Sequence, residues 1–461
     1  MVVGEVSTFT QVLVIGGGPG GYTAAQRAAD GGRSVVLVER DRLGGVCLNA
    51  GCIPSKALIQ VAHAAALPAA AARWGVDLSA RVDMNRAQDW MASVIDGLRA
   101  GVEGLMRRAG VTVVAGTTRF TSPHRVVVAT PTATQHIEFD HAIVATGSRP
   151  MELGALPVDH HRVLDSTDAL ALREVPPRLA VVGGGYIGLE LGCAFQKLGS
   201  AVTVVEVADR LLPAMHPALA RTLERRLVAQ GLELLLRTTA LEDDGAALRV
   251  EGPDGERRVQ ADLVIVAVGR RPNTDDLGLE RAGVRRDGGG RVEVDRARRA
   301  TATVLAIGDV TAGPALAHKA TAEARVAGAV AAGGRAEFDP ACIPQVVFTD
   351  PQVASVGLTP AEAAAAGAAV ETRRLPLAAS ARAVMSGEST GMVELVAERG
   401  SGVLLGAHLV GPEAAELIAE AALAIEMGAT VDDLALTIHP HPTLSEMIAD
   451  AALAGGHPVE M

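Results

Sequence analysis

Two stretches of the sequence, residues 11–40 and 178–207, share one pattern that strongly constrains the fold. In each, an apolar run leads into a glycine-rich turn, a helical segment, a glycine stop and a second apolar run that ends in glutamate. The spaced glycines and the acidic residues of the two copies are Gly16, Gly18, Gly21 and Glu39, and Gly183, Gly185, Gly188 and Glu206. A strand, a G-x-G-x-x-G turn and a helix in this order are typical of a Rossmann-like βαβ unit. We therefore predict two such units.

Each unit is expected to bind a dinucleotide. Glycine lets the backbone turn tightly and approach a pyrophosphate, and the N-terminus of the following helix offers free N–H groups to the phosphate oxygens. The acidic residue at the end of the second strand accepts hydrogen bonds from ribose hydroxyls. In the second copy the carboxylate of Glu206 would repel a 2′-phosphate, so we expect this unit to prefer NAD over NADP, even with Arg210 nearby in the sequence.

Length and composition indicate a globular enzyme with several domains. The chain has 461 residues, several times the length of a typical single-core domain, and 49% of them are hydrophobic. The formal net charge is −11 and no basic block occurs, which argues against a nucleic-acid partner. The sequence lacks a basic N-terminal leader and any run of about eighteen apolar residues, so we expect a cytoplasmic protein that does not span a membrane.

Cys47 and Cys52, in the stretch GGVCLNAGCIPSK, allow three interpretations: a structural disulfide, a pair of metal ligands or a redox couple. A disulfide across so short a loop removes little chain entropy. The other two cysteines lie far away and have no histidines at zinc-finger spacing, so we expect no metal site. A predicted helix start and the nearby Lys56 favour a thiolate at Cys52, and this favours the redox couple.

Lysine is rare in this chain. Only Lys56, Lys197 and Lys319 occur, and the other 39 of the 42 basic residues are arginine. Such a bias usually reflects base composition and has no function in itself. A lysine that persists can nevertheless mark a position where arginine cannot substitute.

Further candidate residues lie at strand ends and near the C-terminus. AIVATGSRP and VIVAVGRRPNT are apolar strands closed by Gly147 and Gly269, where the chain can pass between domains. VLAIGDV ends in Asp309, whose carboxylate can accept hydrogen bonds from sugar or ribityl hydroxyls. In TIHPHPTLSEMI, Glu446 can accept from one imidazole nitrogen of His441 and leave the other available as a base. By itself, a His–Glu pair is more often an ordinary surface contact.

Six stretches together carry a family resemblance. GGVCLNAGCIPSKAL, GGGYIGLELG, ATGSRP, AIGDV, FTDPQVASVGLT and HPHPTLSE occur in the order seen in the flavin-dependent pyridine nucleotide-disulfide oxidoreductases, and the chain resembles this family over nearly its whole length. The resemblance implies an α/β fold with two Rossmann-like domains, for FAD and NAD, and an α+β C-terminal dimerisation domain. The implied boundaries are 1–149 for the FAD-binding domain, 150–271 for the NAD-binding domain, 272–340 for a central domain that completes the FAD site, and 341–461 for the interface domain.

The resemblance also implies roles for individual residues. Cys47 would exchange with the substrate disulfide, Cys52 would be the thiolate that touches the flavin, and His441, held by Glu446, would be the acid–base group. Lys56 and Glu190 match a pair near the flavin N5, and Gly45 would let a flat ring approach the backbone. Tyr186 is open to two interpretations, a cover over the nicotinamide pocket or an ordinary half-buried ring. The expected FAD- and NAD-binding residues are Gly16, Gly18, Gly21, Glu39, Gly45, Lys56, Gly147, Gly183, Gly185, Gly188, Glu190, Glu206, Gly269 and Asp309.

The implied activity is the oxidation of dihydrolipoamide to lipoamide with reduction of NAD+, through a Cys47–Cys52 disulfide. The implied partners are a second copy of the chain, in a homodimer with shared active sites, and the lipoyl-bearing acyltransferase (E2) of a 2-oxo acid dehydrogenase complex. A stand-alone NAD(P)H-dependent reductase of another disulfide is the main alternative. A mercuric-reductase-like enzyme is a weaker one, since the tail AGGHPVEM contains no cysteine pair. A diaphorase or a structural subunit of such a complex is a further possibility of a different class.

Overall fold

The computed structural model describes residues 7–454, and the chain divides into two compact units. The first unit contains the residues up to 57 together with 88–151 and 269–339. The second contains 58–87, 152–268 and the residues from 340 onward. Each unit is therefore assembled from segments that are distant in the sequence, and each is described separately below.

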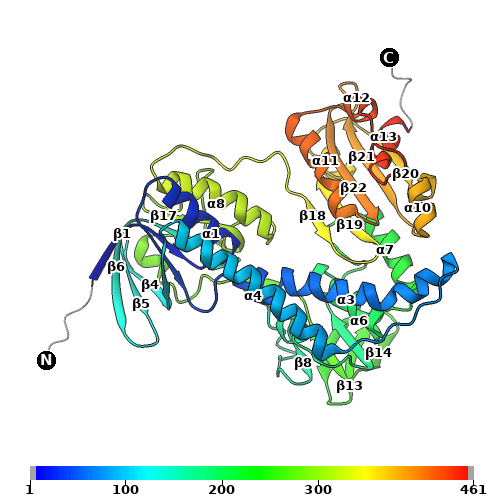
Figure 1. The fold of residues 1–461 in the computed structure, drawn as a ribbon, viewed down its shortest axis with the longest axis horizontal. Helices are drawn as coiled ribbons and strands as arrows, with labels where there is room; N and C mark the ends of the chain where they lie inside the picture. Colours follow the sequence, from blue (N-terminus) through cyan, green and yellow to red (C-terminus); the bar gives the residue numbers. More distant parts are fainter. Residues whose placement is uncertain (1–6, 455–461) are drawn as a thin grey trace. The chain divides into compact units, whose positions relative to one another are not determined.

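A seven-stranded sheet forms the centre of the first unit, in the order β3-β2-β1-β6-β5-β4 with β17 paired to β6 (Figure 1). The strands β3, β2, β1, β6 and β17 pair in parallel, whereas β4 and β5 add an antiparallel extension to β6. The strand bounds are Ser7–Ile15 (β1), Val35–Glu39 (β2), Thr112–Ala115 (β3), Thr117–Ser122 (β4), Arg125–Ala129 (β5), Thr134–Val144 (β6) and Val304–Ala306 (β17).

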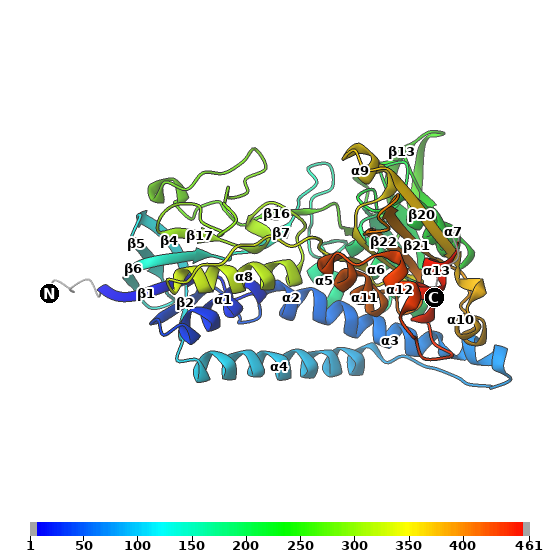
Figure 2. The same cartoon turned by 90° about the horizontal axis from the view of Figure 1, so that it is seen from above.

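The core of this unit lies on both faces of the sheet. In β1, Val12 and Val14 belong to one buried cluster, and Leu13 and Ile15 belong to another, because successive side chains of a strand point to opposite faces. Helices α1 (Pro19–Asp30) and α8 (Ala317–Ala331) pack side by side (Figure 2). Their contact is rich in alanine, and such small side chains let two helices approach closely. The remaining helices are α2 (Gly45–Ala50), α3 (Cys52–Ala71) and α4 (Met84–Arg108), of which α3 and α4 continue across the unit boundary.

The second unit contains the other glycine-rich turn, in a parallel five-stranded sheet of order β11-β10-β9-β15-β8. Its strands are Val163–Leu164 (β8), Arg178–Val182 (β9), Ala201–Val205 (β10), Glu233–Leu235 (β11) and Leu263–Val266 (β15). The associated helices are Ser166–Leu170 (α5), Tyr186–Leu198 (α6) and Pro217–Ala229 (α7). A three-stranded antiparallel sheet follows, made of Thr239–Asp243 (β12), Ala247–Gly252 (β13) and Gly255–Gln260 (β14).

The C-terminal part of the second unit is an antiparallel sheet of order β18-β19-β22-β21-β20. Its strands are Gln345–Val347 (β18), Gln352–Gly357 (β19), Val370–Pro376 (β20), Met392–Glu398 (β21) and Leu404–Gly411 (β22). Helix α11 (Ala414–Met427) packs on β19 and β22, and α13 (Glu446–Leu453) packs on β20 and β21. The shorter helices are Pro360–Ala365 (α9), Ala381–Ser386 (α10) and Val431–Leu436 (α12).

The two Arg-Pro stretches that were expected to mark domain crossings pair with each other. Strand β7 (Ser148–Pro150) is antiparallel to β16 (Arg270–Pro272), with Arg271 opposite Arg149. The chain leaves the first unit after residue 151 and returns to it at residue 269, directly beside this ribbon. The predicted fold class, two Rossmann-like sheets followed by an α+β domain, is confirmed, and the four exact domain boundaries stay a prediction.

Candidate active site

The first glycine-rich turn connects β1 to α1. Gly16 has a φ of +103°, and a Cβ on it would lie 2.4 Å from the carbonyl oxygen of Ala145. A Cβ on Gly21 would lie 1.8 Å from the carbonyl oxygen of Gly16. At Gly18, in contrast, the nearest atom to an added Cβ is the Cα of Gly45 at 3.9 Å. Gly16 and Gly21 are thus required by the turn and its packing, and Gly18 leaves open space for a ligand.

The second turn, between β9 and α6, repeats this geometry. Gly183 has a φ of +112°, and its added Cβ would lie 2.4 Å from the carbonyl oxygen of Ala267. An added Cβ on Gly188 would lie 2.2 Å from the carbonyl oxygen of Gly183. An added Cβ on Gly185 would meet no atom within 4 Å. The same division between structural glycines and one open glycine therefore occurs in both units.

Each acidic residue is held at the edge of its own turn. Oε2 of Glu39 accepts the N–H of Gly17 at 2.6 Å, and Oε2 of Glu206 accepts the N–H of Gly184 at 2.6 Å. The second oxygen of each carboxylate accepts a backbone N–H from the residue two positions further along the chain. A carboxylate oxygen can accept more than one hydrogen bond, so both groups keep acceptor capacity for ribose hydroxyls.

The helix N-termini beside these turns also suit an anion. Neither α1, after Gly18, nor α6, after Gly185, has a side chain that caps its first N–H groups. Helices α5, α9 and α12, by comparison, all begin with a capping box. Uncapped N–H groups at a helix start favour phosphate oxygens. The residues at both turns therefore fit the pyrophosphate of FAD or NAD.

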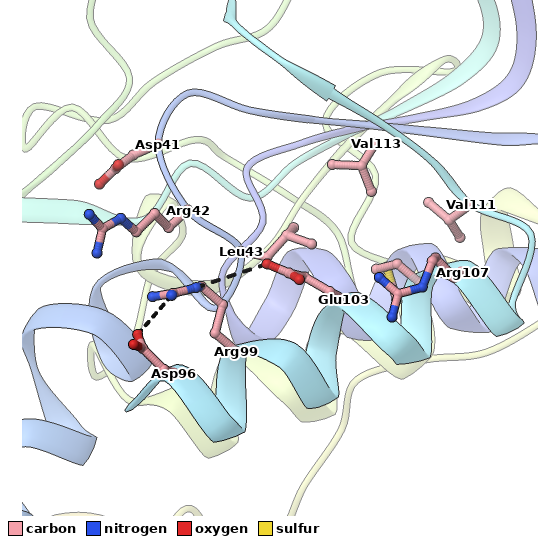
Figure 3. A pocket seen from close by; sticks show the side chains of 10 residues that line it. Asp41, Arg42, Leu43, Asp96, Arg99, Glu103, Arg107, Val111 and Val113 are labelled. Atoms are coloured by element: carbon pink, nitrogen blue, oxygen red, sulfur yellow. Dashed lines mark hydrogen bonds and ion pairs between the residues drawn. The ribbon is translucent and has the colours of Figure 1, made fainter. Parts of the chain in front are cut away.

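A cavity of about 730 Å³ lies at the end of β2, in the first unit (Figure 3). Its walls come from the loop after β2, from α4 and from the start of β3; the lining residues are Asp41, Arg42, Leu43, Asp96, Arg99, Glu103, Met106, Arg107, Val111 and Val113. Arg99 is ion-paired with Asp96 at 2.7 Å and with Glu103 at 3.9 Å. The sequence did not predict this cavity, because its charged residues are spread over two segments that only the fold brings together.

The two cysteines lie on either side of a break between two helices. Cys47 is in α2, and Cys52 is the first residue of α3, with Gly51 between the helices. Both are in the thiol form; Cys52 is exposed and Cys47 is half-buried. Gly45, at the start of α2, has a φ of +58°, and an added Cβ would lie 2.7 Å from the Cα of Gly18. The cysteine loop thus packs directly on the first glycine-rich turn, and this contact is a reason for Gly45 that the sequence did not suggest.

The electrostatic surroundings make the two thiols unequal. The pKa of Cys47 is raised well above its ordinary value, first by the hydrogen bond that its thiol donates to Cys52, then by burial and by the negative charge of Cys52. The positive charge of Lys56, one helical turn after Cys52, acts in the opposite direction on the same pKa. Cys47 therefore favours the thiol form when both sulfurs are reduced.

Asp309 lies in a short turn after β17 (Gly308–Val310). Its carboxylate accepts a hydrogen bond from Ser148 Oγ at 2.5 Å, and Arg270 Nε donates to the same hydroxyl oxygen at 2.7 Å. Gly147 and Gly269 both have positive φ values, +68° and +132°, and they introduce the ribbon β7–β16 that contains Ser148 and Arg270. These two glycines are explained by backbone conformation, and Ser148 is a contact of Asp309 that the sequence did not predict.

His441 and Glu446 form a close pair in the second unit. Nδ1 of His441 lies 2.8 Å from Oε1 of Glu446, and the imidazole is 74% exposed. Oε2 of Glu446 accepts the N–H of Thr443 at 2.8 Å. The pKa of Glu446 is lowered by the Thr443 N–H and then by the hydrogen bond with His441. With Nδ1 engaged by the carboxylate, Nε2 is the nitrogen that can exchange a proton.

A second His–Glu pair supports the same loop, and it was missed in the sequence. Nε2 of His439 lies 2.9 Å from Oε1 of Glu420 on α11, and Nδ1 lies 2.9 Å from the carbonyl oxygen of Thr437. His439 is nearly buried. HPHP contains both histidines, but only the fold shows that the first one faces the protein and the second one faces outward.

The candidate residues divide between the two units. Both cysteines, Lys56 and the FAD candidates Gly16, Gly18, Gly21, Glu39, Gly45, Gly147 and Asp309 belong to the first unit, as does Gly269. The second unit contains Gly183, Gly185, Gly188, Glu190, Glu206, His441 and Glu446. Glu190 is buried on α6 and accepts the N–H of Phe348 at 3.0 Å, and Tyr186 starts the same helix, 37% exposed.

Two negative findings apply to residues 7–454. Within this range, no group of three or more histidine, cysteine, aspartate or glutamate side chains is arranged to hold a metal ion. Over the same residues, every helix is too short or too polar to cross a bilayer.

Comparison with known proteins identifies the family. Residues 10–324 match the model of the pyridine nucleotide-disulphide oxidoreductases, and residues 343–452 match the dimerisation domain of that family. The chain is 43% identical to a dihydrolipoyl dehydrogenase of Geobacillus stearothermophilus, covering 100% of this chain and 99% of the relative. It is 46% identical to a dihydrolipoyl dehydrogenase of Haloferax volcanii, covering 98% and 97%.

Solved structures agree with the sequence relatives. The crystal structure of LpdA from Mycobacterium tuberculosis matches with a TM-score of 0.89 at 32% identity, over 96% of this chain and 99% of that chain. The Cu(II) complex of the HOCl-induced flavoprotein disulfide reductase RclA from Escherichia coli matches with a TM-score of 0.86 at 27% identity, over 97% and 99%. From the paired glycine turns, the cysteine loop and these full-length matches, we conclude that the chain belongs to the pyridine nucleotide-disulphide oxidoreductase family.

Proposed function

We propose that this chain has dihydrolipoyl dehydrogenase activity: it oxidises dihydrolipoamide to lipoamide and reduces NAD+ to NADH with release of a proton. The observation that carries the proposal is the pair of unequal thiols, Cys47 in α2 and Cys52 at the start of α3, in a loop packed on an open glycine-rich turn. Full-length relatives with this activity in their names support the choice of substrate.

The cysteines would work as a disulfide that opens and closes. One substrate thiolate attacks the Cys47 sulfur and releases Cys52 as a thiolate, which leaves a mixed disulfide between Cys47 and the substrate. The second substrate thiol then attacks that mixed disulfide, closes the lipoamide ring and releases Cys47. Two electrons thereby pass from the substrate to the cysteine pair. FAD, when bound, supplies the two-electron chemistry that connects this dithiol to NAD+.

The different environments of the two sulfurs suit these different roles. Cys52 is at a helix N-terminus and four residues before Lys56, and both features stabilise a thiolate leaving group. Cys47 donates a hydrogen bond to Cys52 and keeps its proton more readily, because its pKa is raised. His441, with Nε2 able to exchange a proton, would take the proton from the incoming substrate thiol and give it to the Cys47 sulfur when that sulfur leaves the mixed disulfide.

For the cofactors, we infer FAD at the first glycine-rich turn and NAD at the second. Glu39 would bind the ribose of FAD, and the Asp309 carboxylate would accept hydrogen bonds from the ribityl hydroxyls of FAD. In the second unit the buried carboxylate of Glu206 already bridges two backbone N–H groups, so a 2′-phosphate placed beside it would be repelled. For this reason we expect the second unit to bind NAD in preference to NADP.

We further infer a homodimer in which His441 and Glu446 serve the cysteines of the other subunit. The match to a dimerisation domain at residues 343–452 supports it. Large apolar side chains exposed on or after α11 and α12 support it too: Leu423 is 64% exposed, Met427 75%, Leu436 56% and Ile438 94%. A second copy of the chain would cover them. A lipoyl-bearing E2 acyltransferase of a 2-oxo acid dehydrogenase complex, in the cytoplasm, would be the partner that carries the dihydrolipoyl group to this site.

Steady-state kinetics of the purified protein test the proposal. We expect NADH formation from dihydrolipoamide and NAD+, and negligible turnover of glutathione disulfide with NADPH. Cys47→Ser and Cys52→Ser should each abolish the dihydrolipoamide reaction. A preference for NADPH and another disulfide would favour the stand-alone reductase instead, and activity that survives Cys47→Ser would contradict the disulfide mechanism.

A further inference from the structure

Three charged side chains are buried together behind the turn that carries Asp309: Arg298, Lys319 and Glu323. Oε1 of Glu323 lies 3.0 Å from Nζ of Lys319 and 2.9 Å from Nη2 of Arg298. Oε2 of Glu323 accepts the N–H of Gly308 at 2.6 Å, and Nζ of Lys319 donates to the carbonyl oxygen of Gly308 at 3.2 Å. The cluster thus fixes both backbone polar groups of the residue that precedes Asp309.

Carboxylates outside this cluster complete its charge. Glu323 and Lys319 are 0% and 2% exposed, and the cluster contains two cations but only one carboxylate. An unbalanced buried charge is costly, so a further negative group close by is expected. Asp295 and Asp309 both contribute. Burial lowers the pKa of Arg298, and the charges of Glu323 and Asp295 raise it. Burial also lowers the pKa of Lys319, the charge of Glu323 raises it, that of Arg298 lowers it, and that of Asp309 raises it least. The main link between the cluster and Asp309 is therefore the pair of hydrogen bonds to Gly308.

The space around Lys319 is shaped for a lysine. Gly313 has a φ of +97°, and an added Cβ there would lie 2.8 Å from Cε of Lys319. Nζ also donates to Thr311 Oγ1 at 3.2 Å, and that hydroxyl donates to the carbonyl oxygen of Gly308 at 2.8 Å. The space is therefore narrow around the methylene groups of Lys319 and small around its ammonium group. The guanidinium group of arginine is planar and wider, so it would fit this space less well. This explains why one of only three lysines in the chain occurs here.

We propose that Lys319 and Glu323 are positioning residues for the flavin cofactor: they fix the Gly308–Thr311 turn so that the Asp309 carboxylate faces the hydroxyl chain of FAD. The inference rests on the FAD site of the proposed function and adds to it two residues that act through Asp309. It predicts that loss of the cluster lowers the affinity for FAD through the ribityl chain and leaves the affinity for the adenosine part unchanged.

The first experiment measures FAD affinity in Lys319→Met, which keeps an unbranched side chain and removes the charge. Purified holoprotein is dialysed against decreasing FAD concentrations, and bound flavin is read by absorbance. We expect the FAD dissociation constant to rise about 10- to 100-fold, the range for loss of a hydrogen bond to a charged group. ADP, which shares the adenosine and pyrophosphate of FAD but lacks the hydroxyl chain, should displace FAD with an unchanged inhibition constant.

A double-mutant cycle tests whether the effect passes through Asp309. In the Asp309→Asn background, adding Lys319→Met should weaken FAD binding by less than about threefold, because the group that the lysine positions has already lost its charge. Lys197→Met is the matched control, since it removes a lysine from an ion pair, with Asp350, in the other unit. It should leave FAD affinity unchanged.

Several outcomes would overturn the inference. It fails when folded Lys319→Met binds FAD as tightly as the wild type, when ADP affinity falls in parallel with FAD affinity, or when the effect persists in full beside Asp309→Asn. A wild type that binds no FAD would overturn the cofactor assignment itself, which separates that failure from this one. When Lys319→Met does not fold, Thr311→Val replaces it, and its removal of one neutral hydroxyl from the same network should still weaken FAD and spare ADP.

Discussion

The substitution Gly185→Ala tests whether the open glycine of the second turn serves the cofactor and not the packing of the turn. Gly185 has φ −80° and ψ 178°, a conformation open to any residue, and an added Cβ would meet no atom within 4 Å. The methyl group should therefore fit the folded protein. It would, however, occupy the open face toward which the N–H groups at the start of α6 point, and this is where the NAD pyrophosphate is expected.

The expected magnitudes follow from this geometry. Alanine reduces the entropy of the unfolded chain, which stabilises by about 0.4–1 kcal/mol, but it is a poorer N-cap residue than glycine by a similar amount. The two effects nearly cancel, so the free energy of unfolding should change by less than about 0.5 kcal/mol. Loss of one N–H contact to a phosphate costs about 1.5–3 kcal/mol, which corresponds to a rise of about 10- to 100-fold in KM for NAD+.

The assay combines thermal unfolding with steady-state kinetics. We expect Gly185→Ala to unfold within about 2 °C of the wild type, with a raised KM for NAD+ and an unchanged KM for dihydrolipoamide. Gly188→Ala is the control: its Cβ would lie 2.2 Å from the Gly183 carbonyl oxygen, so it should lose about 1–3 kcal/mol of stability. Normal NAD+ kinetics in a folded Gly185→Ala protein would refute the assignment of this turn.

Three further predictions concern the C-terminal region. His408 in β22 has its pKa lowered to about 4, first by burial and then by the charge of His216, so the unfolded chain binds a proton below pH 6.5 that the folded chain does not. Stability should thus fall by about 3 kcal/mol as the pH drops from 6.5 to 4, and denaturant titrations of His408→Gln should lack this part of the loss. Glu446→Gln should lower kcat/KM for dihydrolipoamide about 10-fold or more while flavin content stays constant, and His441→Gln should lower it about 10²- to 10⁴-fold; equal activity of both variants and wild type would remove the acid–base assignment. Ile438→Asp, at a 94% exposed side chain, should shift sedimentation toward a monomer with parallel loss of activity; a stable dimer would place the interface elsewhere.

The features that could be predicted from the sequence are those that depend on residues close together in the chain. A strand, a glycine turn and a helix are written in one continuous stretch of about thirty residues, and Glu39 and Glu206 follow at a regular distance. The start of α3 at Cys52 and the pairing of His441 with Glu446 are likewise short-range. Such features depend on chain geometry over a few turns, and this geometry is set by residue type and spacing.

The contacts missed in the sequence are long-range and have weak local signals. Ser148 is hydrogen-bonded to Asp309, 161 positions away, and Glu420 on α11 is paired with His439 in the loop after α12. Gly45 packs its backbone on Gly18, a contact that the sequence did not indicate, and its expected role beside a flat ring stays a prediction. Only the rarity of lysine pointed to Lys319, because the residues around it, AHKA, do not indicate a buried ion pair or a contact with the turn at Gly308.

The two βαβ units followed from the sequence, because spacing dictates which backbone groups can form a turn and begin a helix. The rest of the fold class came from the family resemblance, and the redox role of the cysteine pair stays a prediction. Which charges share a buried site, and which side of each loop faces the protein, are set only in the folded chain. Those outcomes depend on desolvation and on the distances between atoms of remote segments. The burial that helps to raise the pKa of Cys47, and the hydrogen bonds of Lys319 and Glu323 with Gly308, exist only once these segments are packed.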